Sequence, residues 1–309
     1  MGKIGEIEVF PLNLGGNVFG WTADESTSFE VLDAYTDAGG NFIDTADVYM
    51  AGVEGNSGGE SETIIGDWLA RRGRRDDVVL ATKVGGWQRR PGLSASNIKE
   101  AAEDSLRRLR TDHIDLYYAH RDVGDVPLEE TLTAFDALVR EGKVRHLGAS
   151  NFTARRLRES LSISDREGLA RFVAVQPHYN LVERDYEREL APLVREEGLA
   201  TLPYYALAKG FLTGKYRSHE GSVDSPRRKG ALSYLDDRGE RVLAALDSVA
   251  AAHSTSVTAV SLAWLTAQPT VAAPIASARD TTQLADLLAA TRLRLTDDEL
   301  AAISVSTDE

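Results

Sequence analysis

The chain has 309 residues, 42% of them hydrophobic and 27% charged, a composition typical of a globular protein with enough apolar material for a core. Its formal net charge of −13 disfavours nucleic-acid and anionic-membrane partners, because both attract basic surfaces. The chain has no cysteine, which excludes disulfides and zinc–cysteine sites. It also lacks an apolar run of membrane-spanning length and the core of a signal peptide, which predicts a cytoplasmic protein.

Short apolar runs typical of buried β-strands alternate with helical patterns along the whole chain. A small hairpin is expected at residues 3–10, ahead of the first strand. The strands are expected at 11–15, 41–44, 78–82, 114–119, 145–150, 173–177, 200–205 and 271–276. The helices are expected at 27–38, 60–71, 95–109, 127–141, 153–165, 185–197, 238–253, 256–267 and 280–290. The strands are apolar on both faces, which is typical of parallel strands covered by helices.

Eight alternations of strand and helix over this length predict a (β/α)8 TIM barrel that forms a single domain over residues 1–309. A doubly wound open sheet is the alternative, and its dinucleotide-binding form needs a G-x-G-x-x-G motif that this chain lacks after the first strand. One long connection, 206–237, follows the seventh strand, and loops of that length are usually functional lids or disordered. Several residues mark helix boundaries: Ser94, Thr153, Thr296 and Pro127 at the starts, and Gly39, Gly142 and Gly198 past the ends.

The segment Tyr-Tyr-Ala-His-Arg-Asp at 117–122 raises a first hypothesis, because its last three residues also begin the catalytic loop of protein kinases. That loop needs a metal-holding Asn at the position that Pro127 occupies here. The chain also lacks Asp-Phe-Gly, and its glycines at 15, 16 and 20 do not fit a phosphate-binding loop. The kinase hypothesis fails, and His120 needs another explanation.

Four residues of complementary chemistry stand at or just after the ends of the second, third and fourth predicted strands. They are Asp44, Tyr49, Lys83 and His120. The carboxyl ends of barrel strands meet at the active-site mouth, so we expect these side chains to converge there. A neighbouring cation stabilises a phenolate, so Lys83, oriented by Asp44, is predicted to lower the pKa of Tyr49 and make it a usable acid.

The same group of residues indicates carbonyl chemistry. His120 can hydrogen-bond the substrate oxygen that Tyr49 protonates, and so orient a carbonyl. No Ser, Cys or metal cluster offers a nucleophile, so a hydride from a bound nicotinamide is the economical hypothesis. A metal site built from His120, Asp122 and Asp44 is disfavoured, because no His-x-His or Glu-x-x-His spacing supports it.

A series of short motifs in this order makes the chain resemble an aldo-keto reductase of the bacterial, potassium-channel-β-like branch, from about residue 5 to about residue 300. The motifs are FIDTADVY, LATKVG, YYAHRD, GASNF, VQPHYN, LPYYALAKGFLTGKY and PIASARDTTQL. The resemblance implies a (β/α)8 barrel and NADP(H)-dependent reduction of an aldehyde or ketone. It also implies a catalytic tetrad of Asp44, Tyr49, Lys83 and His120, with Tyr49 as the general acid and base.

The resemblance further implies a dinucleotide in the barrel mouth. The implied cofactor-binding residues are Gly16, Asn17, Ser150, Asn151, Gln176, Tyr204, Tyr205, Ala206, Leu207, Lys209, Gly210, Lys215, Ser277, Arg279, Gln283 and Asp286. Among them, Tyr204 is implied to stack on the nicotinamide and Arg279 to lie near the 2′-phosphate. A guanidinium suits a phosphate dianion, which favours NADP(H) over NAD(H).

Two other functions are known from members of the family that this chain resembles. One is a non-catalytic NADP(H)-sensing subunit, similar to potassium-channel β subunits, which carry Asn at the His120 position and Arg at the Asn151 position. The other is reduction of a carbon–carbon double bond, in members with Glu at the His120 position. Because this chain has His120 and Asn151, the sequence favours the carbonyl reductase.

The substrate is expected to be a small carbonyl or alcohol compound. Trp21, Trp87 and Arg121 stand on loops at the mouth and are predicted to line the substrate pocket. The basic cluster 227–229 is interpreted as solvated, with a second phosphate contact as the alternative. A monomer is preferred to an oligomer, and no metal is expected.

Overall fold

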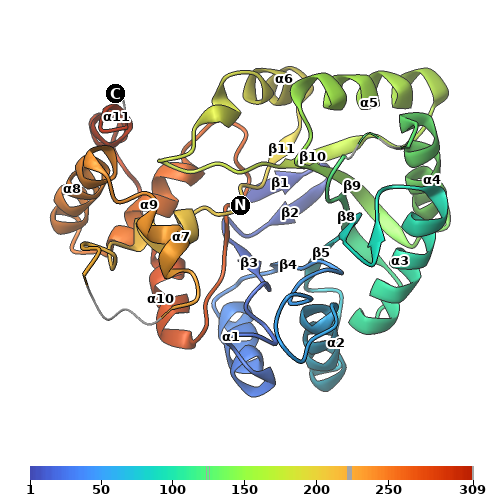
Figure 1. Ribbon diagram of the computed structural model, residues 1–309, viewed down its shortest axis with the longest axis horizontal. Coiled ribbons are helices and arrows are strands. Elements are labelled where there is room, and N and C mark those ends of the chain that lie inside the picture. Colours follow the sequence, from blue (N-terminus) through green and yellow to red (C-terminus); the bar gives the residue numbers. More distant parts are fainter. Residues whose placement is uncertain (123, 125, 221–224, 308–309) are drawn as a thin grey trace.

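The computed structural model describes residues 1–122, 124, 126–220 and 225–307, and within them eight parallel strands form one curved sheet (Figure 1). The strands pair in the order β11-β10-β9-β8-β5-β4-β3-β12. A bridge between Thr201 and Val271, and a 2.9 Å hydrogen bond from Ile275 N to Pro203 O, connect the two end strands and close the sheet. The predicted (β/α)8 barrel is confirmed. The strands are β3 (Asn13–Gly15), β4 (Phe42–Asp44), β5 (Val79–Val84), β8 (Ile114–Ala119), β9 (Val144–Ser150), β10 (Phe172–Gln176), β11 (Ala200–Thr201) and β12 (Ile275–Ala276).

Helices surround the sheet and pack their apolar faces on it (Figure 1). Their starts follow the capping chemistry of the sequence: Ser94, Thr153 and Thr296 each accept a backbone N–H from the third residue beyond. The helices are α1 (Glu25–Asp37), α2 (Glu60–Arg72), α3 (Ala95–Leu109), α4 (Leu128–Arg140), α5 (Ala154–Glu167), α6 (Leu190–Glu196), α7 (Arg228–Leu232), α8 (Asp237–Ala252), α9 (Val257–Thr266), α10 (Thr281–Ala290) and α11 (Asp297–Val305). Within the described part of the chain, none of them is long and apolar enough to cross a membrane.

Five elements differ from the sequence prediction. The expected strands 200–205 and 271–276 shrink to β11 and β12, because Pro203 and Pro274 cannot donate a ladder hydrogen bond. The expected helix 185–197 splits into the 3-10 turn η1 (Asp185–Glu187) and α6, whose first turn contains Pro192. The hairpin of β6 (Gly86–Trp87) with β7 (Arg90–Pro91) is absent from the prediction. Of helix α11, the sequence predicted only the start at Thr296 and no range.

The predicted long connection after the seventh strand is partly ordered. It contains the 3-10 segment η2 (Ala208–Thr213) and the short helix α7, and both pack against each other. Residues 221–224 of this connection lie outside the described residues.

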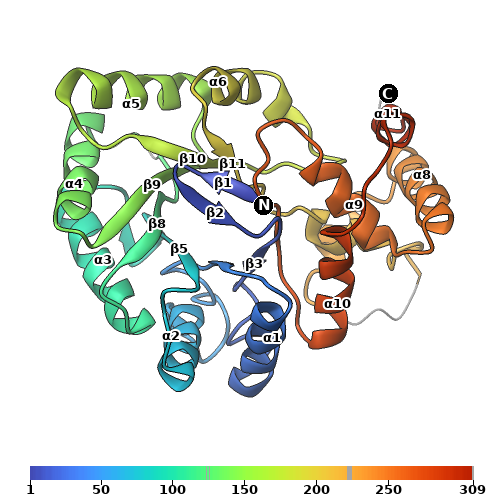
Figure 2. The same ribbon diagram turned by 180° about the vertical axis from the view of Figure 1, so that it is seen from behind.

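The predicted N-terminal hairpin is confirmed and covers one end of the barrel (Figure 2). It consists of β1 (Gly2–Ile4) and β2 (Ile7–Val9), whose Ile4 and Val9 pack with buried residues of the barrel interior such as Phe42 and Leu116. This end holds the amino ends of the parallel strands, so the carboxyl ends lie at the opposite mouth. That mouth is where a barrel of this type places its chemistry.

Candidate active site

The structure brings Asp44, Tyr49, Lys83 and His120 together at the carboxyl end of the barrel. The ammonium of Lys83 is the centre of the group. It donates to Asp44 Oδ2 at 2.5 Å, to the Thr45 carbonyl at 2.7 Å and to Tyr49 Oη at 2.8 Å. The rings of Tyr49 and His120 stand edge to face with centroids 6.4 Å apart. The four side chains therefore lie close together at the carboxyl ends of the strands, as the sequence predicts.

The Asp44–Lys83 ion pair is buried beneath the cavity. Asp44 is 1% exposed and Lys83 is 0% exposed, so neither side chain reaches solvent. The second oxygen of Asp44 accepts a 2.8 Å hydrogen bond from Gln176 Nε2, which fixes the carboxylate from the strand opposite. Burial lowers the pKa of Lys83 from its usual value, and the Asp44 carboxylate opposes that shift. Each of the two side chains thus depends on the other to stay ionised in its buried position.

The pKa of Tyr49 is raised in this structure, against the direction expected from the neighbouring Lys83 alone. Burial raises the pKa of Tyr49 well above its usual value, and the Asp44 carboxylate raises it further. Tyr49 is therefore a phenol that donates a proton, held in place by its two neighbours. Burial, followed by the charges of Lys83 and Arg121, lowers the pKa of His120 to about 3, so its imidazole is neutral. This arrangement suits protonation and orientation of an oxygen more than its deprotonation.

A cavity of about 300 Å³ opens directly above Tyr49 and His120. Most of the predicted cofactor and substrate residues line it: Asn17, Trp21, Arg121, Ser150, Asn151, Gln176, Tyr204, Tyr205, Ala206, Leu207, Lys209, Gly210, Lys215, Ser277, Arg279 and Gln283. They come from the loops after β3, β8, β9 and β11, from the last residues of β9 and β10, from the segment between β12 and α10, and from the first turn of α10. The carboxyl ends of strands far apart in the sequence thus share one hollow.

Three predicted residues lie outside this lining. Gly16 faces α2, since a Cβ there would stand 2.6 Å from Ser61 Oγ. Trp87 belongs to the β6–β7 hairpin, where the guanidinium groups of Arg89 and Arg90 cover its ring. Asp286 is exposed on α10, one turn beyond the cavity-lining Gln283. The structure therefore gives none of the three a direct contact with the cavity.

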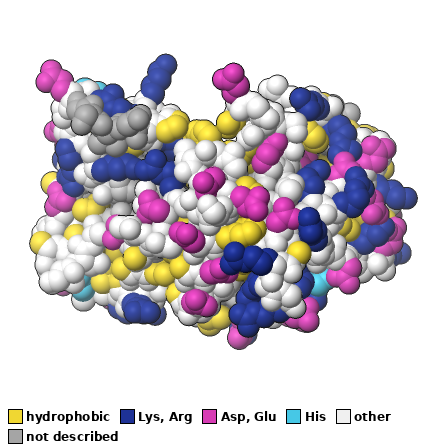
Figure 3. Space-filling model, turned by 90° about the horizontal axis from the view of Figure 1, so that it is seen from below, with side chains coloured by type: hydrophobic (Ala, Val, Ile, Leu, Met, Phe, Trp, Pro, Cys, Tyr) yellow, Lys and Arg dark blue, Asp and Glu magenta, His cyan; other side chains and the backbone are white. Residues whose placement is uncertain are grey.

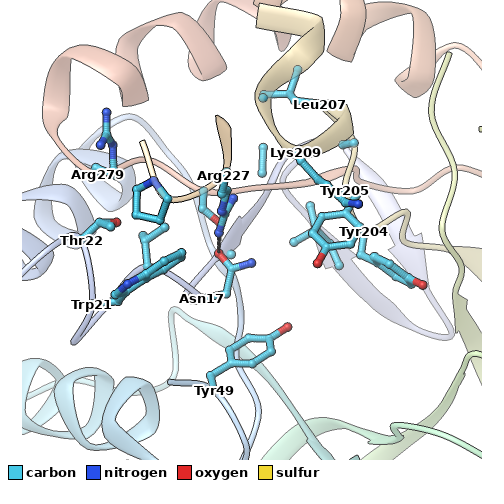
Figure 4. A pocket seen from close by; sticks show the side chains of 18 of the residues that line it. Asn17, Trp21, Thr22, Tyr49, Tyr204, Tyr205, Leu207, Lys209, Arg227 and Arg279 are labelled. Atoms are coloured by element: carbon cyan, nitrogen blue, oxygen red, sulfur yellow. Dashed lines mark hydrogen bonds between the residues drawn. The ribbon is translucent and has the colours of Figure 1, made fainter. Parts of the chain in front are cut away.

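Sequence reasoning missed Arg227, which the structure places in the cavity wall rather than in solvent (Figure 4). Its Nη2 donates to Asn17 Oδ1 at 3.1 Å, and its guanidinium lies 5.6 Å from the centre of the Trp21 ring. Asn17 Oδ1 also accepts from Ser277 Oγ at 2.7 Å. Burial lowers the pKa of Arg227. The sequence offered only a basic cluster as a signal, and three adjacent cations do not reveal which one turns inward. Nine further lining residues were not predicted: Gly15, Val18, Thr22, Thr213, Tyr216, Ser225, Pro226, Ile275 and Ala276.

The loops of the cavity hold unusual backbone conformations. Asn151, Tyr205 and Lys209 have φ of 58°, 51° and 58°, in the left-handed region that non-glycine residues seldom adopt. Asn151 is secured because its Nδ2 donates to the His120 carbonyl at 3.0 Å and its Oδ1 accepts from Tyr204 Oη at 2.8 Å. Such strained residues persist where their surroundings determine them, and they cluster at functional sites.

The charges around the cavity are one-sided. Its described lining includes five cationic side chains, Arg121, Lys209, Lys215, Arg227 and Arg279, and no carboxylate. The rest of the molecule carries the acidic excess, and on the face in Figure 3 acidic and basic side chains are interspersed. The described residues contain no group of three His, Cys, Asp or Glu side chains that could hold a metal. The described lining therefore has a positive electrostatic potential, which attracts anions.

A buried carboxyl beside the site gives a prediction about stability. Asp47 is 2% exposed, its Oδ1 has no partner among the described residues, and burial raises its pKa to about 7. A carboxyl whose pKa is raised on folding contributes stability that is complete below its unfolded pKa of about 3.9 and is lost as the pH rises through the folded value. The shift corresponds to about 4 kcal/mol of unfolding free energy.

We expect Asp47→Asn to remove this pH-dependent loss. The unfolding free energy of the variant minus that of the wild type should therefore be several-fold larger at pH 8 than at pH 5. Urea unfolding at both pH values measures the difference. The matched control is Asp286→Asn, which changes an exposed carboxyl. An equal free-energy difference at the two pH values would show that Asp47 does not titrate in this range.

Comparison with known proteins agrees with this geometry. The family model described as "Aldo/keto reductase family" matches residues 11–306. Protein tas of Escherichia coli is 33% identical over 326 residues, which cover 96% of this chain and 94% of that protein. The uncharacterized oxidoreductase YrpG of Bacillus subtilis is 34% identical, with 96% and 91% covered, and norsolorinic acid reductase B of Aspergillus parasiticus is 32% identical, with 96% and 80% covered. On this whole-length match the chain belongs to the aldo/keto reductase family.

Proposed function

We propose that the protein is an NADP(H)-dependent reductase that converts an aldehyde or ketone to an alcohol. The family and its oxidoreductase-named relatives support an oxidoreductase, and members of the family generally use NAD(P)H. The observation that carries the proposal is the phenol of Tyr49, hydrogen-bonded to Lys83 and facing a carboxylate-free cationic cavity. We further propose a single-domain, cytoplasmic protein that acts as a monomer.

In this mechanism the chain positions and protonates the substrate oxygen. A bound nicotinamide nucleotide supplies the hydride. Tyr49 donates its proton to the carbonyl oxygen as negative charge develops there, and Lys83 stabilises the phenolate that remains. Asp44 keeps Lys83 charged in a buried position. Neutral His120, beside Tyr49, hydrogen-bonds the same oxygen and sets its direction.

The cationic residues of the cavity fit the phosphates of a dinucleotide. A buried guanidinium without a carboxylate partner is costly, and the described partners of Arg227 are only an amide oxygen and a tryptophan ring. An anion at this place would satisfy it. Ser277 and Arg279 line the same end of the cavity, just before α10. We propose that this group binds the pyrophosphate and the 2′-phosphate, which selects NADP(H) over NAD(H).

We expect Arg279→Ala to weaken NADPH binding by about tenfold or more while changing NADH binding much less, because only NADPH carries the 2′-phosphate. Quenching of intrinsic fluorescence during titration with each nucleotide measures both affinities. The control is Arg292→Ala, which removes an exposed cation outside the cavity lining. Equal weakening of both nucleotides would place Arg279 elsewhere than at the 2′-phosphate.

Consumption of NADPH, followed by its absorbance with a panel of aldehydes and ketones, tests the reaction itself. Turnover that depends on Tyr49 supports the reductase. Tight nucleotide binding without turnover of any carbonyl would instead favour the non-catalytic sensing subunit. Failure to bind either nucleotide would contradict both functions, and only the assignment of the (β/α)8 barrel fold would still stand.

A further inference from the structure

One cation of the cavity stands apart from the other four. Lys209, Lys215, Arg227 and Arg279 come from the segment between β11 and α10, whereas Arg121 directly follows His120 at the end of β8. A dinucleotide with a 2′-phosphate carries roughly four negative charges at neutral pH, two of them on that monoester. The four cations of the β11–α10 segment match that charge. Arg121 is left over on the side of the carbonyl chemistry.

The backbone around Arg121 is fixed, while its side chain is free. His120 N donates to the Val84 carbonyl at 2.8 Å, and the His120 carbonyl accepts from Asn151 Nδ2 at 3.0 Å. The guanidinium of Arg121 makes no hydrogen bond or ion pair with any residue in the described part of the chain, and the side chain is exposed at the cavity mouth. A rigid strand end thus presents an unpaired guanidinium to whatever enters the cavity.

The carboxylate next to it in the sequence does not neutralise it. Asp122 is occupied by Arg156, whose Nε donates to Oδ2 at 2.5 Å and whose Nη2 donates to Oδ1 at 3.2 Å. The N–H of Gly124 donates to the same Oδ1 at 3.1 Å. These three bonds hold Asp122 toward α5. The fold therefore separates two adjacent opposite charges and leaves Arg121 available.

The charge of Arg121 acts on the residues around the reacting oxygen. It contributes to the lowered pKa of His120 after burial and Lys83, and it opposes the burial that raises the pKa of Tyr204. Aromatic rings of Trp21, Tyr204 and Tyr205 line the same cavity. An anion bound by the Arg121 guanidinium would therefore leave the part of the substrate between it and the carbonyl among these aromatic rings, which suits an apolar or aromatic spacer.

We propose that Arg121 makes the enzyme selective for carbonyl substrates that carry a carboxylate, separated from the carbonyl by a short apolar or aromatic spacer. The inference rests on the proposed reductase function. A guanidinium and a carboxylate form paired, charge-assisted hydrogen bonds, which are the strongest in this class. Binding at the far end of the substrate would hold the carbonyl against Tyr49 and His120.

The test compares 4-carboxybenzaldehyde with its methyl ester, methyl 4-formylbenzoate, which has the same ring and aldehyde and no charge. In the wild type with NADPH, we expect kcat/KM to be higher for the acid. Arg121→Gln should lower the ratio of kcat/KM for acid over ester by about tenfold or more, chiefly through KM, because it removes a charge-assisted contact. Arg121→Lys should retain part of the ratio. Arg155→Gln removes an exposed cation that does not line the cavity and should preserve the ratio.

Each result separates this inference from the function on which it rests. Reduction of both aldehydes with an unchanged ratio in Arg121→Gln would overturn the selectivity and leave the reductase intact. A parallel loss of NADPH affinity and of activity on both aldehydes would assign Arg121 to the nucleotide and also overturn it. Absence of turnover with these and all other carbonyls in the wild type would overturn the reductase, and the inference with it.

Discussion

Tyr49→Phe is expected to lower kcat/KM for aldehyde reduction by about 10²–10⁴-fold, the range of a lost general acid. The change removes only the hydroxyl that Lys83 contacts at 2.8 Å and that faces the cavity. The pKa of this phenol is raised by burial, so in the wild type the proton is present throughout the neutral range. Steady-state kinetics at saturating NADPH measure the loss.

Nucleotide titration of the same variant serves as its control. The phenyl ring keeps its shape, so NADPH should still quench the fluorescence with an affinity close to that of the wild type. Loss of binding together with activity would mean that Tyr49 supports the nucleotide site instead of the chemistry. Full activity in the variant would show that another group protonates the oxygen, and the neighbouring His120 would be the first to examine.

Lys83→Met is expected to lower the free energy of unfolding by about 3–5 kcal/mol, because it leaves the Asp44 carboxylate buried without its cation. Lys83 is fully buried and supplies three hydrogen bonds, to Asp44, Thr45 and Tyr49. Activity should fall as well, because the phenolate of Tyr49 loses its stabilising charge. Denaturant unfolding and steady-state kinetics measure the two effects.

The double variant Asp44→Asn with Lys83→Met separates stability from chemistry. Replacing a buried ion pair by neutral groups is often close to neutral for stability, so most of the unfolding free energy should return. The substituted side chain would keep an amide oxygen for Gln176, which donates to Asp44 Oδ1 at 2.8 Å in the wild type. Activity should stay low, since no cation remains beside Tyr49. Recovery of both properties would show that Lys83 acts only as a structural partner.

The fold was readable in the sequence because its signals are local and repeated. Eight apolar runs alternate with helical patterns, and capping residues such as Ser94 and Thr153 bond where their types predict. The hairpin β1–β2 and the barrel are both confirmed. The errors fall where local signals conflict, as at Pro203 and Pro274, which end the strand pairing early.

The candidate site was only partly readable. Residues at strand ends, such as Asp44 and His120, could be placed because a parallel barrel brings all carboxyl ends to one mouth. The inward turn of Arg227 and the packing of Trp87 under Arg89 and Arg90 could not, because loop backbones are set by long-range contacts such as that of Arg227 with Asn17. The direction of the Tyr49 pKa was missed for a related reason. The burial of the phenol depends on all the residues that surround it, and the charged neighbours identified in the sequence do not reveal that burial.

The sequence by itself determined the order of elements, the barrel, the family motifs and the set of residue types at the strand ends. Those properties follow from hydrophobic periodicity and turn chemistry, which act over short stretches of chain. Only the tertiary structure decided which cations face the cavity, which carboxylates are neutralised and which groups are desolvated. Asp122, turned to Arg156, and Arg121, left unpaired beside it within the described part of the chain, illustrate the difference. Electrostatic environments depend on distances between segments remote in sequence, and folding alone sets those distances.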